Sequence, residues 1–237
     1  EDGERRMVYD PPQETAPLLW QDLSTCSSAE IEQQLAAGLD SAQASLDLEN
    51  GPVFRAAAFW LGESRGSRLL LAAHHLVIDA VSWRIILEDL YALFQQIGSG
   101  LPAALPEKTT SFKAWAESQP EMAQHPAVLE QLPFWLEQAA LPTAQIPLDD
   151  PNGTNREMDA EAVSLTLSIE ETQRMLQEAA NTYHCDIPTL LATALVQALK
   201  DWTGEPRWRI EMEGHGRDAV SGNMDLSRTV GWFTSLY

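Results

Sequence analysis

Residues 74–83 read HHLVIDAVSW, and this stretch decides the expected fold. The preceding residues 69–73 (LLLAA) form an apolar run typical of a buried strand, and residues 81–97 then carry apolar side chains at helical spacing. The stretch therefore predicts a strand-to-helix junction that holds two imidazoles and the carboxylate of Asp79. Burying such titratable groups is costly unless they are paired or used, so the chemistry of the protein is expected here first.

The composition is that of an acidic globular protein. The chain has 237 residues, of which 44% are hydrophobic and 21% charged, and its formal net charge is -20. This charge argues against nucleic acid and anionic membranes as partners, because no basic patch is available to displace counterions. No apolar run is long enough for a membrane span. The distant Cys26 and Cys185 form neither a disulfide framework nor a metal set, which predicts a reducing, cytoplasmic location.

The predicted elements mix helices with strands. Two capping boxes, at residues 27–30 and 168–171, each open a helix, and Asp186 caps another that ends at Gly204. Strands are expected at residues 53–61 and 68–73, joined as an antiparallel hairpin, and again at residues 163–167, 207–213 and 229–237. Residues 1–25 are expected to be mostly connecting. The pattern predicts a mixed α/β sandwich rather than a purely parallel sheet.

The two adjacent histidines of the junction cannot both face the same cavity. Successive side chains of an extended backbone point to opposite sides, so His74 and His75 do not converge on one metal ion, and no metal site is expected. The alternative to a catalytic role is that both are core residues with satisfied hydrogen bonds. Asp79 either caps the following helix or holds an arginine or a histidine.

A second polar group follows the expected strand at residues 207–213. Residues 213–217 read EGHGR, and the glycines on either side of His215 let the backbone bend tightly and come close to a ligand. Taken alone, Glu213 is a solvated residue at a strand end, and His215 and Arg217 are ordinary loop residues. Residues 213–217 indicate a function only when they are considered together with residues 74–83.

Three motifs, in order along the chain, carry a family resemblance. Residues 74–83 resemble the HHxxxDG motif of the nonribosomal peptide synthetase condensation superfamily, in the form typical of epimerization domains. Residues 213–217 resemble the EGHGR motif of that family, and residues 228–234 resemble its RTVGWFT motif. The resemblance implies part of a chloramphenicol-acetyltransferase-like fold, with two lobes and a tunnel between them. Residues 1–145 would form the N-terminal lobe, and residues 146–237 would begin the C-terminal lobe.

The resemblance also implies a reaction and a set of site residues. A peptidyl carrier protein domain would deliver an aminoacyl or peptidyl thioester on a phosphopantetheine arm, and the Cα of that substrate would be epimerized. His75 and Glu213, one from each lobe, would be the catalytic pair. The supporting residues would be His74, Asp79, Ser82, Trp83, His215 and Arg217. No cofactor is expected to bind directly, and the neighbouring synthetase domains are expected in the same polypeptide.

The chain departs from the family pattern in two ways. Position 80 is Ala where the motif usually has Gly, and both ends look truncated, which predicts a piece of a longer polypeptide. The family usually ties the motif aspartate to an arginine of an earlier segment, so Asp79 is expected to lack that partner here. Two other functions stay open, namely an amide-forming condensation domain and a non-catalytic carrier-docking or scaffold fragment. The sequence does not specify the amino acid that is epimerized.

Overall fold

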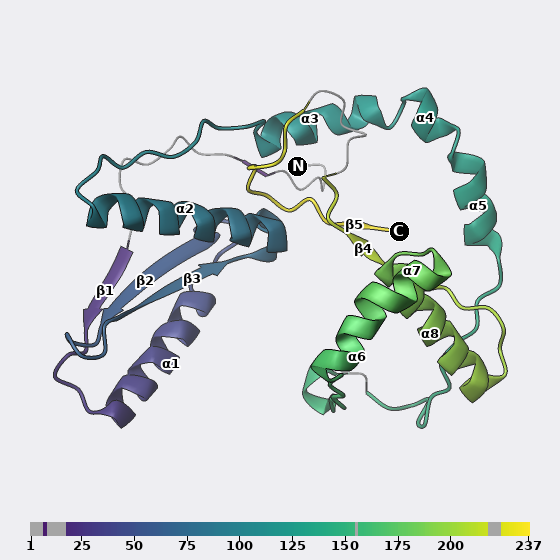
Figure 1. Ribbon diagram of the computed structural model, residues 1–237, viewed down its shortest axis with the longest axis horizontal. Helices are drawn as coiled ribbons and strands as arrows, with labels where there is room; N and C mark the ends of the chain where they lie inside the picture. Colours follow the sequence, from purple (N-terminus) through teal and green to yellow (C-terminus); the bar gives the residue numbers. More distant parts are fainter. Residues whose placement is uncertain (1–6, 9–17, 155, 218–223) are drawn as a thin grey trace. The chain divides into compact units, whose positions relative to one another are not determined.

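The computed structural model describes residues 7–8, 18–154, 156–217 and 224–237 of the chain. It forms two compact units, one made of Glu1–Met122 and His215–Ser235, the other of Ala123–Gly214 and Leu236–Tyr237. The chain contains both helices and strands, as labelled in Figure 1, which confirms the predicted mixed α/β class. The predicted lobes, residues 1–145 and 146–237, stay a prediction.

The first unit contains a three-stranded sheet of order β1-β2-β3. β2 (Phe54–Trp60) and β3 (Ser67–Ala73) pair antiparallel, which confirms the predicted hairpin. β1 (Leu18–Asp22) pairs parallel with β2, so the expectation of a connecting segment is wrong for these residues. Its short apolar stretch becomes a strand because the edge of β2 offers unpaired backbone groups, a long-range cause that local sequence does not reveal.

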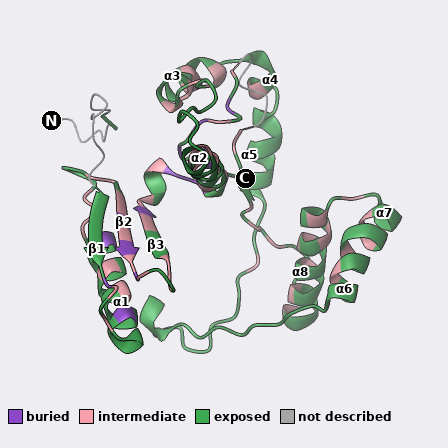
Figure 2. Cartoon of the chain, turned by 60° about the vertical axis from the view of Figure 1, so that its left-hand side comes forward, coloured by how far each residue is buried: buried purple, intermediate pink, exposed green. Residues whose placement is uncertain are grey.

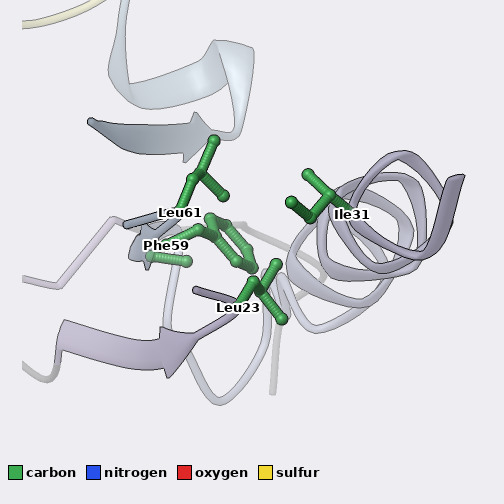
Figure 3. Packing of buried hydrophobic residues seen from close by; sticks show 5 residues of the cluster. Leu23, Ile31, Phe59 and Leu61 are labelled. Atoms are coloured by element: carbon green, nitrogen blue, oxygen red, sulfur yellow. The ribbon is translucent and has the colours of Figure 1, made fainter. Parts of the chain in front are cut away.

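The helix α1 (Ser28–Ala44) packs against this sheet and begins at the predicted capping box. The Ser27 hydroxyl accepts a hydrogen bond from the Glu30 N–H, and the Glu30 carboxylate accepts one from the Ser27 N–H at 2.8 Å. Apolar side chains of α1 and the sheet then form the core. Figure 3 shows Leu23, Ile31, Phe59 and Leu61 in contact there.

The predicted strand-to-helix junction is confirmed. β3 ends at Ala73, a single 3-10 turn η1 (His75–Val77) follows, and α2 (Ala80–Gly98) begins at the N-cap residue Asp79. The last helix of this unit is α3 (Phe112–Met122).

The second unit is mainly helical, and Figure 2 shows that α6, α7 and α8 are largely exposed. The Ser168 capping box and the cap at Asp186 are confirmed, and Gly204 ends the last helix with a positive φ of 78°. The elements of this unit are α4 (Pro126–Leu129), α5 (Leu132–Ala140), η2 (Glu157–Asp159), α6 (Ile169–Gln173), the π-helical η3 (Arg174–Ala179), α7 (Ala180–Tyr183), α8 (Ile187–Thr203) and β4 (Glu213–Gly214). β4 is the partner of β5 (Ser235–Leu236) in a two-stranded sheet.

Three predicted strands are wrong or much shorter than expected. Residues 163–167 form no strand, and Val163 and Leu165 are 95% and 96% exposed. The strands expected at residues 207–213 and 229–237 shrink to β4 and β5. Apolar alternation produces a strand only where a neighbour supplies hydrogen bonds, and none of the described residues pairs with residues 163–167. Within the described part of the chain, no helix has the length and apolar character needed to cross a membrane.

Candidate active site

Asp79 joins the three sequence motifs in the first unit. Its Oδ1 accepts a hydrogen bond from the Ser82 N–H at 2.7 Å, which caps α2. Arg217 Nη2 lies 3.0 Å from both carboxylate oxygens, and the Phe233 N–H donates to Oδ2 at 3.3 Å. Asp79 therefore both caps the helix and holds an arginine. The arginine comes from the EGHGR motif, later in the chain, and the expected lack of an arginine from an earlier segment stays a prediction.

The surroundings of Asp79 keep it ionised. Burial by itself raises the pKa of Asp79, but the hydrogen bonds from Ser82, Arg217 and the Phe233 N–H outweigh burial and hold this pKa below its ordinary value of 3.8. The carboxylate is 5% exposed, so it is a buried charge that is paired at neutral pH.

Arg217 also binds backbone carbonyl groups just before and within the RTVGWFT motif. Its Nη1 donates to the Leu226 carbonyl at 3.0 Å and to the Thr229 carbonyl at 2.7 Å. Its guanidinium carbon lies 4.0 Å from the centre of the Phe233 ring, a cation–π contact. One guanidinium therefore holds the backbone both just before the RTVGWFT motif and within it.

Ser82 fixes the middle of the same motif and is fully buried. Its hydroxyl donates to the Gly231 carbonyl at 2.9 Å and accepts from the Gly231 N–H at 3.0 Å. It also accepts from Arg217 Nη2 at 3.0 Å. The first turn of α2 is thus clamped to the RTVGWFT segment by a hydroxyl and a carboxylate.

The glycine of the EGHGR motif permits this close packing. Gly216 has a φ of +63°, and a Cβ atom there would lie 1.6 Å from the Phe233 carbonyl oxygen. The close approach at Gly216 is to the backbone of Phe233, and the expected approach to a ligand stays a prediction. The N–H that follows Gly216, that of Arg217, donates to His215 Nδ1 at 3.1 Å.

The two junction histidines have different surroundings, and His75 lies in the 3-10 turn η1 and not in the extended backbone that the sequence predicted. The half-buried His74 caps η1, and its Nδ1 accepts a hydrogen bond from the Leu76 N–H at 3.2 Å. His75 is exposed, so the core alternative is wrong for it. Its ring centre lies 5.9 Å from that of Trp232, and the two planes meet at 67°.

The remaining predicted residues fall into both units. Trp83 is half-buried in the first turn of α2, where its N–H donates to the Asp79 carbonyl at 3.1 Å. Glu213 is exposed in β4 of the second unit, whereas His75 belongs to the first. The meeting of His75 with Glu213 stays a prediction.

Some residues of this site were missed in the sequence, although a signal existed. Phe233, Gly231 and Trp232 all belong to the RTVGWFT motif, which indicated the family without indicating contacts. As for metals, no three His, Cys, Asp or Glu residues gather within the described segments.

Residues 1–237 of the chain match the family model of the condensation domain. The chain belongs to the condensation domain family. Its curated relatives include linear gramicidin synthase subunits D and C from Brevibacillus parabrevis, which are 41% identical over 231 residues and 45% identical over 228 residues. These alignments cover 97% and 94% of this chain but only 4% and 3% of the relatives.

Solved structures of this family include the epimerization domain from the third module of tyrocidine synthetase B. It is 34% identical, with a TM-score of 0.80 over 93% of this chain and 48% of that chain. The condensation enzyme VibH is 19% identical, with a TM-score of 0.66 over 97% of this chain and 51% of that chain, and supports the fold alone. The condensation and epimerization fold that the motifs implied is therefore confirmed, and this chain spans about half of each of these structures.

Proposed function

We propose that this condensation-family chain epimerizes the Cα of an aminoacyl or peptidyl thioester. The observation that carries the proposal is the likeness to the tyrocidine synthetase epimerization domain, at 34% identity and a TM-score of 0.80 over 93% of the chain. Residues 74–83, which have the form typical of epimerization domains, support the same reaction. The relatives are synthase subunits, so the substrate is proposed to arrive on the phosphopantetheine arm of a carrier protein domain.

The chemistry needs two groups, one on each face of the reacting carbon. A base takes the Cα proton, the electron pair of the C–H bond moves into the thioester carbonyl as an enolate, and a proton returns from the other side. In the proposal, Glu213 and His75 are these two groups. The protonated imidazole of His75 would stabilise the enolate oxygen or return the proton, while the Glu213 carboxylate acts as the base.

The network around Asp79 would serve this site without touching the substrate. Asp79, Ser82 and Arg217 bond to one another and to the backbone of the RTVGWFT segment, so most of their polar atoms are occupied within the network, although the buried Nε of Arg217 has no hydrogen-bond partner among the described residues. Their proposed role is to hold the segment that lies beside His75. Small displacements of such a support are costly because proton transfer depends on geometry.

Deuterium wash-in at Cα tests the proposal. In the protein that contains this chain, with a loaded carrier in D₂O, the wild type should incorporate deuterium at Cα and yield both epimers. Glu213→Gln should lose exchange by about 100-fold or more, the scale of a general base. Glu211→Gln is the matched control, since Glu211 is also exposed and lies two residues earlier. Full exchange in Glu213→Gln would remove Glu213 from the mechanism.

Amide formation is the second candidate function, favoured by the match to the condensation domain model. A donor carrier and an acceptor aminoacyl carrier, supplied together, discriminate the two reactions. A new amide bond without Cα exchange would select condensation, and α-epimers without a new amide would select epimerization. Carrier binding with neither product would select the non-catalytic docking function.

A further inference from the structure

We propose that Trp232 is a positioning residue that holds the imidazole of His75 in one orientation. The use of this orientation in catalysis rests on the proposed function, in which His75 handles the enolate or the returning proton. The contact itself is a feature of the first unit, to which both residues belong.

The ring contact is edge-on and lies at the protein surface. The ring centres of Trp232 and His75 are 5.9 Å apart, with planes inclined at 67°. Trp232 is 39% exposed and His75 is exposed, so both rings border solvent. An aromatic pair of this geometry favours the paired orientation by about two- to tenfold.

Hydrogen bonds hold the backbone on both sides of Trp232 in place. Gly231 exchanges two hydrogen bonds with the Ser82 hydroxyl, and the Phe233 N–H donates to Asp79. Burial alternates along this segment, since Gly231 and Phe233 are buried and Trp232 between them is exposed. The hydrogen bonds that hold Gly231 and Phe233 in the buried network therefore leave the indole between them at the surface, where it contacts His75.

His75 needs such a neighbour more than the other two histidines of the motifs do. His74 accepts a hydrogen bond from the Leu76 N–H, and His215 accepts one from the Arg217 N–H. Within the described residues, the His75 imidazole makes the ring contact with Trp232 and no hydrogen bond. An exposed side chain without a hydrogen bond samples several rotamers unless packing selects one. The indole is the group in place to make that selection.

Steady-state deuterium exchange of Trp232 variants tests whether the orientation of His75 contributes to catalysis. Trp232→Leu should lower kcat by about two- to tenfold and leave the KM for the loaded carrier unchanged, because orientation and not binding is lost. Trp232→Phe keeps an aromatic edge and should restore most of kcat, a rescue that a purely structural role would not give. Trp202→Leu, at another exposed tryptophan, is the matched control and should behave as wild type.

Histidine NMR tests the orientation without any reaction. The Hε1 signal of His75 can be assigned by its loss in His75→Gln. The ring current of Trp232 should displace this signal in the wild type. Trp232→Leu should remove the displacement, and Trp202→Leu should not.

Each outcome decides the inference. An unchanged kcat in Trp232→Leu, equal losses in Trp232→Leu and Trp232→Phe, or an unmoved His75 signal would each overturn it. A wild type that exchanges no deuterium would overturn the proposed function instead, and the NMR result alone would then decide whether Trp232 orients His75.

Discussion

At the scale of single residues, one buried ion pair organises the site. Asp79 and Arg217 lie 138 positions apart in sequence, and their side chains are only 5% and 8% exposed. Each also bonds to the backbone of the segment from Leu226 to Phe233. The pair therefore sets the position of a loop as well as neutralising two buried charges.

Removing the cation of this pair should be strongly destabilising. Arg217→Ala leaves the Asp79 carboxylate buried and uncompensated, which costs about 3–5 kcal/mol in the free energy of unfolding. Arg84→Ala is the control, because Arg84 forms an exposed helix pair with Glu88 and its loss should cost about 0.5 kcal/mol or less. Urea unfolding of both variants measures the difference. Similar costs for the two would mean that the buried pair contributes no more than a surface pair.

The same pair predicts a pH dependence of stability. The pKa of Asp79 is lowered in the folded state, so its stabilising contribution is complete above its ordinary value of 3.8 and is lost as the pH falls below that value. The destabilisation caused by Asp79→Asn should therefore be largest at neutral pH and shrink between about pH 5 and pH 2. Denaturant unfolding of wild type and variant across this range measures it. A destabilisation that stays constant with pH would contradict the ionised state of Asp79.

At the scale of elements, local signals were predictable and partner-dependent ones were not. The caps at Ser27, Ser168 and Asp186 are set within four residues, and the structure has all three helix starts. A strand depends on a neighbour that local sequence does not specify. This is why β1 was missed, and why the alternating residues 163–167 were wrongly expected to form a strand.

The cap of α1 gives a prediction at this scale. Ser27→Ala removes the acceptor for the Glu30 N–H and the hydroxyl that donates to the Glu30 carboxylate, so it should cost about 1 kcal/mol. Ser28→Ala, one position further along, removes no cap and should cost a few tenths of a kcal/mol at most. Thermal unfolding compares the two variants. Equal melting temperatures would show that α1 is held by its packing on the sheet and not by its cap.

At the scale of the whole molecule, the motifs indicated which residues matter but not how they meet. Local sequence places Asp79 at a helix start, and the structure adds that the EGHGR arginine reaches it. Spacing along the chain could not reveal this, because the contact depends on how distant segments fold back. The pairing of Trp232 with His75 was hidden for the same reason, although both lie in motifs quoted from the sequence.

The net charge of -20 predicts how a carrier domain would bind. Towards a carrier that is itself acidic, long-range electrostatics is repulsive, and salt shortens its reach from about 10 Å at 0.1 M to about 3 Å at 1 M. Raising salt should therefore leave the Kd for a separate carrier unchanged or lower it, and tethering in one polypeptide would supply the effective concentration. Calorimetry at low and high salt measures the Kd, with a charge-neutralised carrier as the control that should show no salt effect. A Kd that rises steeply with salt would mean that opposite charges meet at the interface, so the carrier would have to present a basic surface to this acidic chain.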